Sequence, residues 1–159
     1  VYLLEKMGME NLIQDWLGQK QTVMPALSAA IVWFAVGFYV LIYLGGLSTV
    51  PEELYEAAAV DGINWWQKLW RITLPLIVQS VTINIIVSTI AILTLFDLPY
   101  VLTQGGPGYA SQTMALMSYQ YAFKAMSQGK AMAMAVMLTL ITVVFAVAEL
   151  FVLNRKSSD

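Results

Sequence analysis

Three long apolar stretches without a charge constrain this chain more than any other feature. Asp, Glu, Lys and Arg are absent from residues 21–51, 72–96 and 131–148. A helix needs about 20 apolar residues to cross the hydrocarbon core of a bilayer, and only a helix or a closed barrel satisfies its backbone there. We therefore predict an all-α integral membrane protein, with transmembrane helices at residues 23–47, 72–96 and 131–153.

The composition supports a membrane protein and excludes other classes. Hydrophobic residues make up 59% of the 159 residues and charged residues 11%, whereas soluble domains have about 45–50% and about 25%. A soluble protein of this length lacks enough polar chain to cover three apolar helices. The net charge of -2, with eight Lys and Arg residues, also argues against nucleic-acid binding, which needs a basic surface.

The chain contains no Cys and no His. Their absence excludes disulfides, His- or Cys-ligated metal sites and a Ser-His-Asp triad, so we expect neither a cofactor nor a metal. An intramembrane enzyme would need Asp97 or Glu149, which lie near the C-terminal ends of successive spans and therefore, on the predicted topology, on opposite sides of the membrane. We expect Glu149 to reach toward the headgroups or toward Arg155 and Lys156.

One face of the second span carries polar side chains. Ser80, Asn84 and Ser88 recur at every fourth residue and so share a helix face. Such a face either lines a path for a polar solute or packs against another helix through hydrogen bonds. Both interpretations stay open, and Asn84 is the best single candidate for contact with a solute.

The loop at residues 48–71 is too structured for a simple connector. We predict a short helix from about Pro51 to Val60, ended by Gly62, because glycine readily adopts a positive φ after a helix. Asn64 is a good N-cap for a second short helix. That helix carries the aromatic side chains expected along a membrane surface, namely Trp65, Trp66 and Trp70.

The same loop carries a recognisable signature, EAA-x3-G-x9-I-x-L-P. Its residues here are Glu56-Ala57-Ala58, Gly62, Ile72 and Leu74-Pro75. The chain therefore resembles the membrane subunits of binding-protein-dependent ABC importers. The residues around the signature and the stretch 97–129 also resemble the carbohydrate-uptake branch of that family.

The resemblance implies a topology. The loop at 48–71 would be the cytoplasmic coupling loop, a helix-turn-helix that docks on the ATPase subunit. The docking role falls on five residues, Glu56, Ala57, Ala58, Asp61 and Gly62. Segments 1–22 and 97–130 would be extracytoplasmic and the tail at 154–159 cytoplasmic. The three spans would be the last three of a usual six, with residues before Val1 supplying the others, in a single ABC transmembrane domain.

The resemblance also implies partners and a location. The protein would be a multi-pass permease subunit in a prokaryotic inner (plasma) membrane, surrounded by lipid. It would work with separate ABC ATPase subunits, a second permease subunit that is identical or different, and an extracytoplasmic solute-binding protein. The ATPase subunits, not this chain, would hydrolyse ATP. A monosaccharide, an oligosaccharide and glycerol phosphate all stay open as the solute.

Two features of the sequence leave alternatives. The eight Lys and Arg residues divide evenly, four on each side of the predicted spans, so the charge bias does not orient the protein. A non-transporting helical scaffold or assembly subunit would explain the apolar helices equally well. It would not explain the signature in the loop at 48–71.

The loop at 97–130 contains Gly105-Gly106-Pro107-Gly108. No Lys-Ser or Lys-Thr follows at the spacing of a phosphate-binding loop, so we interpret this segment as a tight turn. An amphipathic helix is predicted from Ser111 to Met126, with Ser111 or Gln112 beginning it. That helix would rest on the membrane surface or contact a docking protein.

Overall fold

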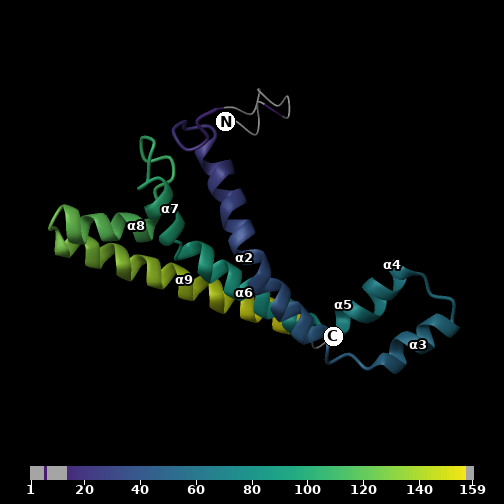
Figure 1. The fold of residues 1–159 in the computed structure, drawn as a ribbon. Helices are drawn as coiled ribbons and strands as arrows, with labels where there is room; N and C mark the ends of the chain where they lie inside the picture. Colours follow the sequence, from purple (N-terminus) through teal and green to yellow (C-terminus); the bar gives the residue numbers. More distant parts are fainter. Residues whose placement is uncertain (1–5, 7–13, 157–159) are drawn as a thin grey trace. The chain divides into compact units, whose positions relative to one another are not determined.

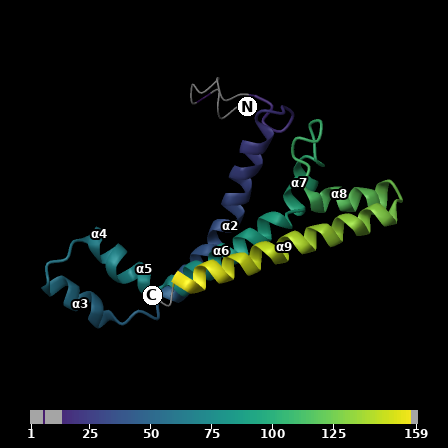
Figure 2. The ribbon, with the colours of Figure 1, turned by 180° about the vertical axis from the view of Figure 1, so that it is seen from behind.

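The computed structural model describes Lys6 and residues 14–156, with side chains as far as Leu153 (Figures 1 and 2). Every regular element in this part of the chain is helical, and η2 and η3 are π-helical turns. In chain order the elements are α2 (Val23–Leu47), α3 (Glu52–Val60), α4 (Trp65–Lys68), η2 (Leu69–Thr73), α5 (Leu74–Leu76), α6 (Val78–Leu93), α7 (Asp97–Leu102), α8 (Met114–Tyr119), η3 (Gln120–Lys124) and α9 (Gln128–Lys156). The predicted all-α fold is confirmed.

Three helical stretches of the described chain are long and apolar enough to cross a membrane, Val23–Leu47, Val78–Leu102 and Gln128–Leu153. The chain divides into two compact units. The first contains the described residues up to Trp33 together with Leu95–Ala135, and the second contains Phe34–Thr94 with the described residues from Val136 onward. Each unit is described by itself below.

Helix α2 covers the residues 23–47 that the apolar pattern predicts, but the second predicted helix, 72–96, is wrong at both ends. Residues 69–76 wind through η2 and α5 instead, and α6 begins at Val78. The break before α6 lies at Ile77, whose φ of -97° and ψ of 14° are not helical, two residues after Pro75, which has no N–H to donate. At the other end, a continuous helix would set Pro99 against the carbonyl of Leu95, so α6 stops at Leu93 and α7 restarts the helix.

Helix α9 is longer than the predicted span 131–153. It begins at Gln128 and continues to Lys156, into the stretch that we predicted as a tail. No Gly or Pro follows Leu153, so nothing in the sequence stops the helix there.

Helix α6 contacts α2 and α9 within the second unit (Figures 1 and 2). The Asn84 amide donates to the carbonyl oxygen of Tyr39 in α2 at 3.4 Å. The Thr89 hydroxyl donates to Glu149 Oε1 in α9 at 2.6 Å. The expectation for Glu149 is therefore wrong, because its carboxylate turns inward to α6 rather than to the headgroups or to the basic tail.

Gly46 is a point of close approach between α2 and α6. A Cβ atom at Gly46 would lie 2.7 Å from Ser80 Cβ, whereas one at the neighbouring Gly45 would meet nothing within 4 Å. The absence of a side chain at Gly46 therefore lets the two helices touch.

We expect Gly46→Ala to destabilise the protein by about 1–3 kcal/mol, the usual cost of overpacking a close contact. The measurement is the thermal unfolding midpoint of the purified protein, with Gly45→Ala as the matched control. Equal midpoints for the two variants would show that α2 and α6 do not meet at Gly46.

Candidate functional site: the loop between α2 and α6

Helix α3 begins and ends as its sequence predicts. Glu52 and Glu53 occupy its first turn, where the positive end of the helix dipole favours carboxylates. At the other end, the Gly62 N–H donates to Ala59 O at 3.2 Å and the Ile63 N–H donates to Ala58 O at 3.0 Å. Gly62 has a φ of 68°, so this is a complete Schellman end. The prediction that Gly62 terminates the helix is confirmed.

The second short helix starts from a full capping box. Asn64 Oδ1 accepts from the Gln67 N–H at 2.9 Å, and Gln67 Oε1 accepts from the Asn64 N–H at 3.2 Å. The prediction of Asn64 as N-cap is confirmed. The Schellman end and the capping box fix the turn between α3 and α4 from both sides, and the two segments form a hairpin (Figure 1).

The five residues with the predicted docking role do not all face outward. Glu56, Ala57, Asp61 and Gly62 are exposed, whereas Ala58 is only 3% exposed. The methyl group of Ala58 therefore contributes to packing within the chain rather than to an exposed docking surface. Trp65, Trp66 and Trp70 are 63–65% exposed, and their place at a membrane surface stays a prediction.

Sequence reasoning missed the contact that closes the hairpin. The hydroxyl groups of Tyr55 in α3 and Thr73 in η2 lie 3.1 Å apart. Lys68 Nζ lies 5.7 Å from the centroid of the Tyr55 ring, within the range of a cation–π interaction. The available signal was the spacing of Tyr55 and Ala58, which places both on one face of α3.

The polar stripe on α6 makes separate contacts. Ser80 lies against Gly46 of α2, and Ser88 donates to Ile85 O of its own helix at 2.8 Å. Asn84 is 4% exposed, and its Oδ1 has no hydrogen-bond partner among the described residues. Ser80 and Asn84 thus make the contacts that the packing interpretation expects, and the buried Asn84 Oδ1 is an acceptor without a donor.

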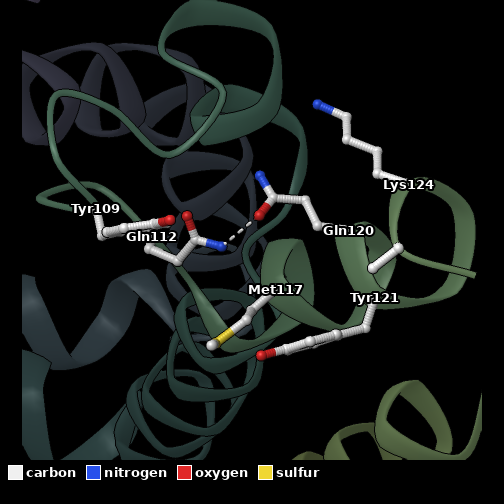
Figure 3. Close-up of a pocket in the computed structure, with 7 residues that line it drawn as sticks. Tyr109, Gln112, Met117, Gln120, Tyr121 and Lys124 are labelled. Atoms are coloured by element: carbon white, nitrogen blue, oxygen red, sulfur yellow. Dashed lines mark hydrogen bonds between the residues drawn. The ribbon is translucent and has the colours of Figure 1, made fainter. Parts of the chain in front are cut away.

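The first unit contains an open pocket of about 480 Å³ beside α8 and η3 (Figure 3). Its lining residues are Tyr109, Gln112, Met117, Gln120, Tyr121, Lys124 and Ala125. Gln112 Nε2 donates to Gln120 Oε1 at 2.8 Å, and the Lys124 nitrogen lies apart from this pair (Figure 3). One hydrogen bond therefore joins the two glutamines, and Gln120 Nε2 donates to Gln104 O at 3.2 Å.

The helix predicted from Ser111 to Met126 is shorter than expected. Thr113 is the N-cap of α8, accepting from the Leu116 N–H at 3.2 Å. Ser111 instead donates to Gly106 O at 2.6 Å. At the other end Met126 has a φ of 51° and lies outside the helix. The tight turn is confirmed, with positive φ at Gly105 and Gly108.

An aromatic cluster lies beside this turn in the same unit. Phe96, Tyr100, Tyr119 and Phe123 follow one another with ring centroids 5.0–5.2 Å apart. The hydrogen bond with Tyr100 raises the pKa of Tyr119. Such ring pairs add to the stability of the segment beyond the area that they bury.

Known proteins similar to this chain agree on its family. A putative ABC transporter permease protein ORF1 of Caldicellulosiruptor sp. is 40% identical and aligns over 80% of this chain and 91% of its own. The sulfoquinovosyl glycerol transport system permease protein SmoG of Agrobacterium fabrum is 33% identical over 97% of this chain. The diacetylchitobiose uptake system permease protein NgcF of Streptomyces coelicolor is 40% identical over 88% of it.

The chain spans about half of SmoG and 40% of NgcF. A solved structure agrees on the fold. It is a bacterial ABC transporter involved in the import of the acidic polysaccharide alginate, with a TM-score of 0.84 and 23% identity. The alignment covers 97% of this chain and 54% of that one. The family described as "Binding-protein-dependent transport system inner membrane component" matches residues 2–156. This chain therefore belongs to that family of multi-pass inner-membrane proteins.

Proposed function

We propose that the chain is a membrane-spanning permease subunit of an ATP-driven ABC importer. It moves a sugar or related solute that an extracytoplasmic binding protein delivers, and a separate ATPase subunit hydrolyses the ATP. One observation carries this proposal. Residues of the EAA signature lie exposed on a helix whose C-terminal turn is fixed by a Schellman end and a capping box. A helix held at a fixed angle can transmit a push from a partner to the spans.

The docking surface consists of the four exposed residues among the five with the predicted docking role, Glu56, Ala57, Asp61 and Gly62. The carboxylate of Glu56 orients and pairs with the ATPase, and the small Ala57 permits close approach. Ala58 supports this surface from inside. When the ATPase subunits close on ATP, α3 moves as a rigid body, and the spans rock about a central solute site.

The proposed topology places the loop at 48–71 in the cytoplasm and the loop at 97–130 outside, where the binding protein docks. A second permease subunit completes the path. On α6, Ser80, Asn84 and Ser88 are the candidate path residues. Asn84 Oδ1 is buried without a hydrogen-bond partner among the described residues. This supports the role, because a helix movement that exposed it would offer an acceptor to a sugar hydroxyl.

Sugar-type solutes are proposed from the relatives. SmoG is named for sulfoquinovosyl glycerol and NgcF for diacetylchitobiose, and the structural neighbour serves the import of an acidic polysaccharide. A non-transporting scaffold accounts for the contacts of α6 with α2 and α9. It gives no reason for signature residues to lie exposed on a hairpin built in this way.

The test is ATP-dependent uptake by the complete transporter, with its ATPase and binding protein, in proteoliposomes. The solutes are the mono- and oligosaccharides that the purified binding protein binds. We expect uptake of at least one of them with wild-type ATPase, and none with an ATPase that cannot hydrolyse ATP. Equal solute entry with both ATPases would contradict the proposal.

A further inference from the structure

The hairpin between α2 and α6 is closed at both ends. At its far end, the Gly62 turn joins α3 to α4. At its near end, the hydroxyl of Tyr55 meets that of Thr73, which is 18 residues further along the chain. Without this second contact, α3 would be held by the Gly62 turn and by the link from α2, and it could tilt about them.

The hydroxyl contact is part of a small network. Thr73 Oγ1 also lies 3.4 Å from the carbonyl oxygen of Lys68, to which it can donate, and either hydroxyl can be the donor in the bond between Tyr55 and Thr73. Thr73 is 8% exposed, and Lys68 Nζ lies over the Tyr55 ring, so water competes little for this bond. A partly buried hydrogen bond of this kind is stronger than an exposed one.

Thr73 is also tied to the membrane helix. The Ile77 N–H donates to Thr73 O at 3.1 Å, and the Val81 N–H donates to Ile77 O at 3.0 Å. The backbone hydrogen bonds thus continue from Thr73 through α5 into α6. A force applied to α3 at Tyr55 can therefore reach α6 through one side-chain bond and these two backbone hydrogen bonds.

We infer that Tyr55 and Thr73 are positioning residues, which lock the coupling helix α3 to the start of α6 so that the two move together. Neither residue belongs to the exposed docking surface. The inference rests on the proposed function, because the locked movement matters only if an ATPase moves α3. It assigns the transmission of the movement to this hydroxyl pair, whereas the residues of the docking surface bind the ATPase.

The test uses Tyr55→Phe, Thr73→Val and the double variant in the complete transporter. Tyr55→Phe keeps the ring and its contact with Lys68 and removes only the hydroxyl. The measured quantity is the number of solute molecules taken up per ATP hydrolysed. We expect this ratio to fall about fivefold in each single variant, which corresponds to the loss of one hydrogen bond of about 1 kcal/mol. The double variant is expected to fall no further than the singles.

Tyr43→Phe is the matched control. Tyr43 lies in α2, and its hydroxyl makes no hydrogen bond to the residues that the structure describes. If the wild type shows ATP-coupled uptake and both single variants keep the wild-type ratio of solute to ATP, the inference is overturned and the proposed function is not. The inference would also be overturned if the ratio in the double variant fell by the product of the two single-variant factors, because the two residues would then act independently. A wild-type transporter without ATP-coupled uptake would overturn the proposed function instead.

Discussion

Replacing Gly62 by Val is expected to lower ATP-coupled uptake more than tenfold while the protein still inserts into the membrane. Gly62 has a φ of 68°, a left-handed conformation that costs a β-branched residue about 1–3 kcal/mol. The strain is relieved if the turn opens and the Ile63 N–H leaves Ala58 O. Helix α3 would then lose its fixed angle to α4. Uptake and ATP hydrolysis in proteoliposomes measure the effect.

Gly62→Asn is the matched control for this prediction. Asn tolerates the left-handed conformation better than other non-glycine residues, and a Cβ at Gly62 would meet nothing within 4 Å. Side-chain volume within the chain is therefore no obstacle in either variant. We expect Asn to keep most of the uptake that Val loses. Equal losses in the two variants would show that contact at the docking surface, not the backbone turn, makes glycine necessary.

Removing the Thr89 hydroxyl is expected to destabilise the protein by about 2 kcal/mol. Glu149 Oε1 accepts its hydrogen bond from Thr89, and Glu149 Oε2 is buried without a partner among the described residues. The variant Thr89→Val would leave both oxygens of this carboxyl group without a donor. A buried polar group without a partner costs about 1–3 kcal/mol. The measurement is the unfolding midpoint in detergent or lipid.

The double variant Thr89→Val/Glu149→Leu tests the reason for that loss. Replacing both partners by apolar residues removes the unpaired carboxyl group, so the double variant is expected to recover most of the stability. Thr82→Val, elsewhere on α6, is the control for loss of a threonine hydroxyl. A double variant less stable than Thr89→Val alone would mean that Glu149 has another partner in the membrane.

Local signals in the sequence predicted local structure well. The apolar run at 23–47 has the bounds of α2. Gly62 and Asn64 were predictable because a helix end depends on one or two residues and their own backbone. The signature at Glu56 predicted the family that the matches then showed.

Features that depend on distant residues were not predictable. The direction of Glu149 is set by Thr89, 60 residues earlier, and the contact of Tyr55 by Thr73. The choice of Thr113 rather than Ser111 as N-cap depends on Gly106, whose carbonyl takes the Ser111 hydroxyl. The burial of Ala58 likewise requires the hairpin to be formed. In each case the partner decides between side-chain positions that the sequence allows equally.

The central claim is that the exposed face of α3 docks on the ATPase, and a crosslink tests it most directly. These 159 residues contain no Cys, so Ala59→Cys, in a transporter otherwise kept free of Cys, introduces a single thiol at an exposed position of α3. Tyr109→Cys, exposed in the other unit, is the control. We predict that a short bifunctional crosslinker joins the thiol at position 59 to the ATPase and that the yield changes when ATP binds. The thiol at position 109 is expected to form no crosslink with the ATPase. No crosslink at position 59, with its thiol freely labelled from the cytoplasm, would contradict the claim.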